Sequence, residues 1–168
     1  MILPALLSDE YCERGSRPVA LIRCEELPDL VLHIVGSNMP DDILELADEH
    51  VIVHGFISDD ELVILYSGVR VSVVPLRFGA GVKGKVLEAL HAGVPVVTTS
   101  VGAEGIPESE TLLTIADEAE TMASALTALY TNVDRLEALA HAGQRMIANE
   151  FSTGAVLAHI REDFLIKP

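Results

Sequence analysis

The stretch from residue 71 to residue 105 constrains the fold more than any other part of the chain. An apolar segment, Val71–Leu76, runs into a loop with three glycines and two lysines, and the sequence predicts that a helix carrying Glu88 follows. A glycine loop between a strand and a helix presents backbone N–H groups and the positive end of the helix dipole to an anion. Because Lys83 and Lys85 lie in the same loop, the pattern predicts the phosphate-binding corner of a nucleotide-binding domain.

Apolar segments alternate with helical patterns along most of the chain. The segments that we predict as strands are Leu30–Val35, Val51–His54, Val71–Pro75, Pro95–Thr99 and Thr111–Ile115. Strands that are apolar throughout are typical of parallel sheets with helices on both faces. Helices are expected between them, from Pro40 to Asp48 and from the capping box Ser58–Glu61 to Ser67. This order predicts an α/β fold, a Rossmann-like doubly wound parallel sheet.

The end of the chain has a helical pattern without strands. Its expected helices are Glu118–Tyr130, Val133–Glu150 and Thr153–Ile166, the last capped by Ser152. With no linker or repeat, the sequence predicts one domain over residues 1–168. Residues 1–27 are atypical: Ile2–Leu7 fits a short strand and Arg17–Glu26 a helix, but no complete first βα unit is evident.

Composition excludes several classes of function. The formal net charge is −15 and only 4% of residues are aromatic, so the chain is not expected to bind nucleic acid. No segment approaches the ~20 apolar residues of a transmembrane helix, and Met1–Leu7 lacks the basic start of a signal peptide. Cys12 and Cys24 form no C-x-x-C pair, so we expect a cytoplasmic protein with reduced thiols. Scattered histidines, and aspartate pairs that helix starts explain, predict no metal site.

The loop itself allows more than one interpretation. Gly79–Gly84 matches the G-x-G-x-x-G pattern of dinucleotide-binding domains. That motif calls for an acidic residue at the end of the next strand. In this chain that strand ends with the hydroxyl residues Thr98–Ser100, and the nearest acidic residue is Glu104. A nicotinamide or flavin enzyme therefore remains a third alternative. Glu88 is either part of a solvated helix face or a carboxylate that binds ribose hydroxyls, and the two lysines are either surface groups or phosphate ligands.

The order of the motifs resembles a known family. The matching segments are Pro28–Gly36, Val53–Leu62, Pro75–Leu90, Gly93–Thr99 with Gly102, and Glu150–Ser152. Together they resemble the C-terminal, donor-binding half of a group-one (family-four) glycosyltransferase of the GT-B fold, over residues 28 to 168. The resemblance implies a nucleoside-diphosphate sugar as donor substrate, transfer with retention of configuration, no metal or other cofactor, and an acceptor bound by a separate N-terminal domain.

The resemblance also implies roles for individual residues. Glu88 matches the second glutamate of the family's E-x7-E motif and would hold the ribose hydroxyls. Lys83 and Lys85 would be the catalytic cations at the diphosphate, and Gly36 and Phe56 would lie near the base and ribose. The loop residues implied in donor binding are Gly79, Ala80, Gly81, Val82 and Gly84. Ala80 stands where many members have the first glutamate, which leaves the contacts to the sugar open.

The resemblance departs from the family at the N-terminus. No Gly-Arg start or phosphate-binding lysine has a clear match before Pro28, and no acceptor domain is evident. We therefore expect a donor half that needs a missing or separate acceptor domain to catalyse transfer. The alternatives are a non-catalytic subunit that binds nucleotide sugars and a truncated remnant. An exposed sheet edge could also form a homodimer.

Overall fold

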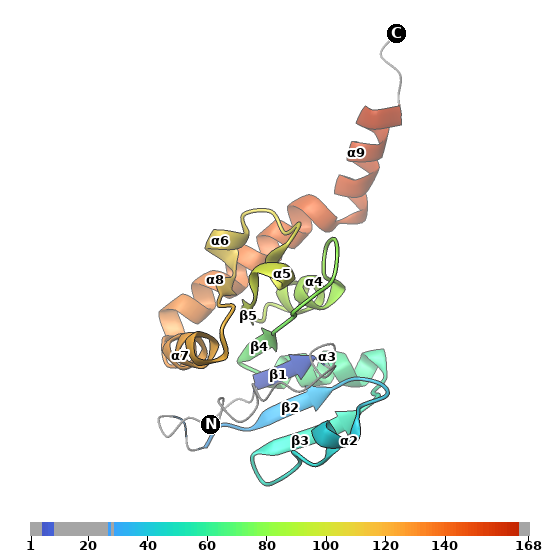
Figure 1. Cartoon of the computed structure of the whole chain (residues 1–168). Coiled ribbons are helices and arrows are strands. Elements are labelled where there is room, and N and C mark those ends of the chain that lie inside the picture. The colour runs from blue at the N-terminus through green and yellow to red at the C-terminus, as the bar shows by residue number, and fades with distance from the viewer. Residues whose placement is uncertain (1–4, 9–26, 28, 165–168) are drawn as a thin grey trace.

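The chain folds around one six-stranded parallel sheet (Figure 1). This is a computed structural model that describes residues 5–8, 27 and 29–164. The strands are β1 (Ala5–Ser8), β2 (Leu32–Val35), β3 (Val51–Gly55), β4 (Val71–Val74), β5 (Val96–Thr98) and β6 (Thr114–Ile115). Their order is β3-β2-β1-β4-β5-β6, and every neighbouring pair is parallel. The predicted doubly wound, Rossmann-like α/β sheet is confirmed.

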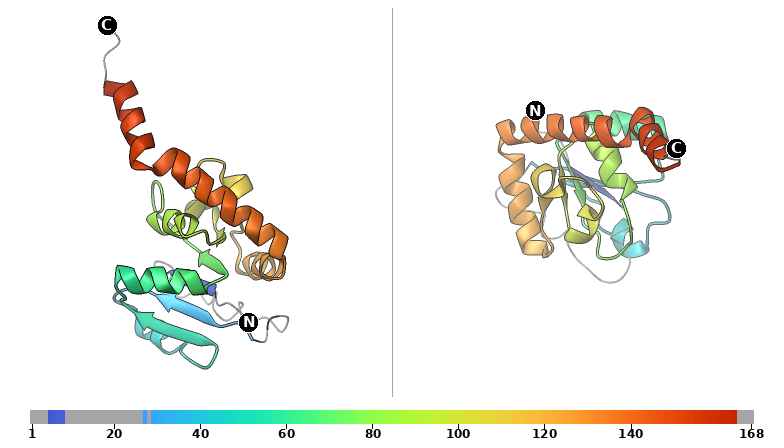
Figure 2. Two further views of the ribbon diagram at one scale, coloured as in Figure 1. Left: turned by 180° about the vertical axis from the view of Figure 1, so that it is seen from behind. Right: turned by 90° about the horizontal axis from the view of Figure 1, so that it is seen from above.

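Helices cover both faces of the sheet (Figure 2). They are α2 (Asp41–Leu44), α3 (Asp59–Gly68), α4 (Gly84–His91), α5 (Ser100–Ala103), α6 (Ser109–Leu112), α7 (Ala119–Tyr130), α8 (Val133–Met146), the π-helical η2 (Ile147–Phe151) and α9 (Thr153–Phe164). The buried residues form two clusters. One packs Val71 and Val73 of β4 with α7, and the other packs Val74 of β4 with α3 and α4. The central strand β4 is therefore buried from both sides, as its largely apolar sequence predicts.

Strand β1 lies in the middle of the sheet although it is first in the chain. Leu7 is opposite Ile34 of β2 on one side and Val73 of β4 on the other. Among the described residues, β1 alone links the β2–β3 pair to β4, β5 and β6. The strand expected over Ile2–Leu7 is thus found at Ala5–Ser8, whereas the helix expected over Arg17–Glu26 lies outside the described residues.

The predicted helix caps are present. The Ser58 N–H donates to Glu61 Oε2 at 2.8 Å, and the Glu61 N–H donates to Ser58 Oγ at 3.4 Å, so α3 begins with a capping box. Ser58 also lowers the pKa of the Glu61 carboxyl, first through its backbone N–H and then through its side chain. Ser152 Oγ accepts the N–H of Ala155 at 3.2 Å, where α9 starts.

Three predicted elements were wrong in their extent. The first two residues of the strand expected over Thr111–Ile115 belong to helix α6, which begins after Glu108, whose φ is 54° and whose carbonyl accepts the N–H groups of Thr111 and Leu112. This turn places Leu112 in the core and leaves only Thr114–Ile115 as strand.

The helix expected from Pro40 to Asp48 ends at Leu44. Asp48 instead forms a turn before β3, in which its carboxylate accepts the N–H groups of His50 and Val51 at 2.8 and 2.9 Å. The helix expected over Val133–Glu150 changes to a π-helical turn after Met146. Within the described part of the chain, no helix has the length and apolar character needed to cross a membrane.

Candidate functional site

The residues predicted to bind the donor lie along the carboxyl edge of the sheet. Gly36 follows β2, Phe56 follows β3, and the glycine loop follows β4. The Gly36 N–H donates to the Gly55 carbonyl at 3.0 Å, which joins the ends of β2 and β3. In doubly wound sheets, ligands bind at this edge where the strand order reverses. Here the reversal falls between β1 and β4, beside the loop.

The glycine loop leads directly into the start of α4. Gly79 and Gly81 have φ values of 137° and 72°, a backbone that other residues rarely adopt. Lys83 is the N-cap residue of α4, and no side chain caps the helix. The first N–H groups of α4 and the positive end of its dipole therefore face the edge of the sheet without a capping carboxylate or hydroxyl.

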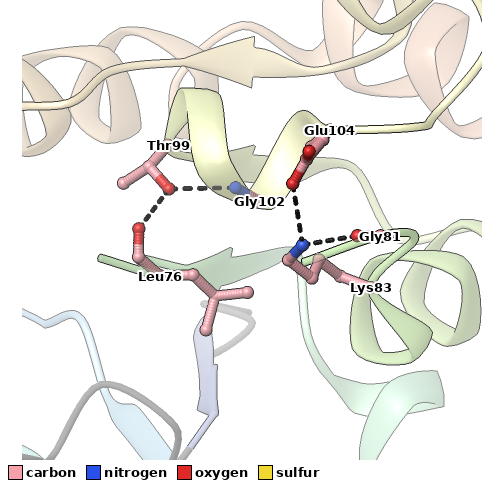
Figure 3. A network of polar contacts seen from close by, with 6 residues as sticks. All are labelled: Leu76, Gly81, Lys83, Thr99, Gly102 and Glu104. Atoms are coloured by element: carbon pink, nitrogen blue, oxygen red, sulfur yellow. Dashed lines mark hydrogen bonds and ion pairs between the residues drawn. The ribbon is translucent and has the colours of Figure 1, made fainter. Parts of the chain in front are cut away.

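Lys83 is buried beneath this loop (Figure 3). Its ammonium donates a hydrogen bond to the Gly81 carbonyl and forms an ion pair with Glu104 Oε2 at 3.4 Å. The Lys83 side chain is 8% exposed and the Glu104 side chain 56%. A Cβ atom on Gly79 would lie 3.2 Å from Lys83 Cε, so the aliphatic part of the lysine runs under the backbone of the loop.

The other predicted residues lie around this loop with different exposure. Lys85 is half-buried in the first turn of α4, and Ala80, Val82 and Gly84 are exposed. Phe56 is 80% exposed after β3. The ring of Phe56 is therefore accessible at the same edge as the loop.

Glu88 is exposed in the second turn of α4, as the sequence indicates. Tyr66 of α3 is buried nearby, close enough for the charge of Glu88 to act on it. Burial raises the pKa of the Tyr66 phenol well above its usual range, and the negative charge of Glu88 adds to this effect.

Two threonines that the sequence analysis did not single out fix the neighbouring turn. Thr99 Oγ1 donates to the Leu76 carbonyl and accepts the Gly102 N–H at 3.1 Å, which caps α5 against the end of β4 (Figure 3). Thr98 Oγ1 donates to the Val74 carbonyl at 2.6 Å. Since Glu104 follows α5, these bonds set where its carboxylate lies. The hydroxyl run Thr98–Ser100 before Gly102 is the signal that could have indicated this capped turn.

The histidines do not gather into a metal centre in the described residues, where no group of three or more His, Cys, Asp or Glu side chains could hold a metal ion. His33 of β2 and His54 of β3 stack with ring centroids 4.9 Å apart, and His33 Nδ1 lies 2.6 Å from His54 Nε2. In the strand register His33 is opposite Ile52, and His54 lies two residues further along β3, where the register shifts.

Comparisons with known proteins agree with this fold. The family model described as glycosyl transferases group 1 matches residues 17–132. The chain matches sucrose-phosphate synthase from Thermosynechococcus elongatus with a TM-score of 0.75 and 20% identity, covering 96% of this chain and 45% of that one. It matches TarM with a TM-score of 0.74 and 17% identity, over 94% and 34% of the two chains.

A third structure corresponds to the chain over nearly its whole length. It is the C-terminal domain of a glycosyl transferase group 1 family protein, LpcC, from Francisella tularensis, with a TM-score of 0.71, 18% identity and coverage of 90% of this chain and 87% of that one. Among curated proteins no match was found. The chain spans about a third of TarM and less than half of sucrose-phosphate synthase. The family model covers more than half of the chain, so the chain belongs to the group 1 glycosyl transferases. Its fold is that of GT-B glycosyltransferases.

Proposed function

We propose that this chain is the donor-binding domain of a retaining, metal-independent glycosyltransferase. It holds a nucleoside-diphosphate sugar at the carboxyl edge of the sheet, and a separate acceptor domain completes the active site. The observation that carries the proposal is the glycine loop, which ends at the uncapped start of α4 with two lysines beside it. Membership of the group 1 family supports the reaction class.

In this proposal the diphosphate lies against the N–H groups of the loop and of the first turn of α4. Fixed donors and positive charge at this place stabilise the diphosphate as it leaves the sugar, without a metal ion. Lys85 supplies positive charge beside these N–H groups in a chain whose formal net charge is −15. Glu88 accepts hydrogen bonds from the ribose hydroxyls, and Gly36 and Phe56 contact the base and ribose.

The first experiment is a calorimetric titration of the folded chain with UDP, GDP, ADP and NAD. We expect one nucleoside diphosphate to bind, and Glu88→Ala to weaken it about tenfold or more, which corresponds to ~1.4 kcal/mol. Glu137→Ala is the matched control, because Glu137 is also an exposed helical glutamate, on α8. Equal affinities of the two variants would contradict the ribose contact, and a preference for NAD would favour the dehydrogenase alternative.

A non-catalytic role in nucleotide-sugar binding is the second candidate. The matches to TarM and sucrose-phosphate synthase, at 17% and 20% identity, extend to the fold and not to the transfer activity. Sugar transfer in the presence of an acceptor-domain chain would support the enzyme. Tight binding of a sugar nucleotide that is never hydrolysed or transferred would support the binding subunit.

A further inference from the structure

We infer that Lys83 is a positioning residue, which holds the glycine loop in shape from beneath through Glu104 instead of contacting the diphosphate. The inference rests on the proposed function where it concerns nucleotide binding. It changes the role that the sequence predicts for Lys83 and leaves Lys85 as the loop lysine that contacts the phosphates.

The first argument is the burial of the lysine. Lysine is almost never buried unless its charge is paired, and Lys83 is 8% exposed with two protein acceptors on its ammonium, the Gly81 carbonyl and the Glu104 carboxylate. Two of the three donors of the Lys83 ammonium are thus directed at protein acceptors. A move toward a ligand would take these bonds apart and leave the Gly81 carbonyl and Glu104 without their partner.

The second argument is the shape of the loop. The bond from Lys83 to Gly81 closes the loop on itself across two residues, where the backbone passes through the positive φ of Gly81. Gly79 lies on the aliphatic chain of the same lysine. Removing Lys83 would therefore take away both the packing under the loop and the bond that closes it.

The third argument is a second contact between the loop and the same turn. A Cβ atom on Gly105 would lie 2.9 Å from Val82 Cγ2, so Val82 packs on the residue next to Glu104. Thr99 fixes this turn after α5 to the end of β4 (Figure 3). A continuous set of contacts thus connects β4, α5, Glu104 and Lys83 to the loop.

The consequence is a loop whose donors are oriented before a ligand arrives. Preorganised N–H groups bind and stabilise an anion without a further cost of ordering. Glu104 also balances the charge of Lys83, so the net attraction for a diphosphate comes from the loop N–H groups, the helix dipole and Lys85.

The test compares Lys83→Met, Lys83→Arg, Glu104→Gln and the double variant Lys83→Met/Glu104→Gln. Thermal unfolding and amide hydrogen exchange of the loop are measured without ligand. We expect Lys83→Met and Glu104→Gln each to lower Tm by about 3–6 °C, to speed exchange of the loop amides, and to combine less than additively. Lys83→Arg should recover part of the loss. Glu110→Gln is the matched control, since Glu110 is an exposed carboxylate on the neighbouring α6.

The same variants are then titrated with the nucleoside diphosphate that the wild-type chain binds. A positioning role predicts that Glu104→Gln weakens binding, because the loop loses its support. Lys83→Met with unchanged Tm and exchange but lost affinity would overturn the inference, as would tighter binding by Glu104→Gln. If the wild-type chain binds none of the nucleotides, the proposed function fails, while the ligand-free measurements still decide whether Lys83 holds the loop.

Discussion

Gly143 of α8 lies directly against Leu90 of α4: a Cβ atom on Gly143 would come within 2.8 Å of Leu90 Cδ2. Leu90 is among the most buried side chains of its cluster, at 1% exposure, so it has little room to move away. The close approach of these two helices therefore depends on the missing side chain at position 143.

We predict that Gly143→Ala lowers the free energy of unfolding by about 1–3 kcal/mol, the usual cost of overfilling a packed core. Urea unfolding measures the effect. Gly68→Ala is the matched control, because it lies in helix α3 with no atom within 4 Å of the added Cβ, and alanine favours a helix over glycine. A Gly143→Ala variant as stable as wild type would show that α4 and α8 adjust freely.

The stacked pair His33 and His54 predicts a loss of stability in mild acid. Burial lowers the pKa of His33 below its usual 6.5, and the nearby His54 lowers it further. Between the lowered pKa and 6.5, the unfolded chain binds more protons than the folded one, so the free energy of unfolding falls as the pH falls. The stabilising contribution of neutral His33 is therefore fully present above pH 6.5 and is lost as the pH falls below it. His54→Phe keeps a ring at the stack but carries no charge. We expect unfolding free energy to fall less between pH 7.5 and 5.5 in this variant, and an unchanged fall would refute the coupling.

The pair Ser100 and Asp117 predicts a second pH effect, in stronger acid. Asp117 accepts the Ser100 N–H and the Ser100 hydroxyl, both at 2.7 Å, and these bonds lower the pKa of the Asp117 carboxyl below its usual 3.8. Their stabilising effect is present above pH 3.8 and is lost as the pH falls through the lowered value. Ser100→Ala keeps the backbone bond and removes the hydroxyl. An NMR titration should then show the Asp117 pKa move part of the way back, and no movement would rule out the hydroxyl as a cause.

The cap of α8 gives a fourth prediction. The side chain of Asn132 accepts the Arg135 N–H at 3.0 Å. Asn132→Ala should lower the free energy of unfolding by about 1 kcal/mol, and Asn132→Asp should keep most of the stability because aspartate also caps helices. Thermal or urea unfolding of both variants makes the comparison. Equal losses in the two would indicate that the cap bond is not the cause.

The sequence predicted the parallel sheet because β4 and β5 are apolar on both faces, and this pattern belongs to strands covered by helices on both sides. It did not predict where β1 pairs. Ala5–Ser8 is only four residues long, and no local pattern says which strands of a sheet become neighbours. The strand predicted from Thr111 begins only at Thr114, because helix α6 (Ser109–Leu112), which follows the positive φ of Glu108, includes Thr111 and Leu112.

At the site, the sequence predicted the loop, the start of α4 and the place of Glu88, because these follow from neighbouring residues. It did not predict the ion pair of Lys83 with Glu104, whose members are 21 residues apart. They meet because β4 and β5 are adjacent and parallel, so the segments after both strands lie at one edge. Such a pairing depends on tertiary structure. Whether each site residue binds the donor stays a prediction.

The central place of β1 has a consequence for how the chain folds. Its partners β2 and β4 lie far along the sequence, and contacts between distant segments slow folding. Until β1 inserts, β2 and β4 each have an unpaired edge, and such edges join other chains and lead to aggregation. The four residues Ala5–Ser8 therefore decide whether the β2–β3 pair and the strands β4, β5 and β6 join in one sheet or remain separate, aggregation-prone intermediates.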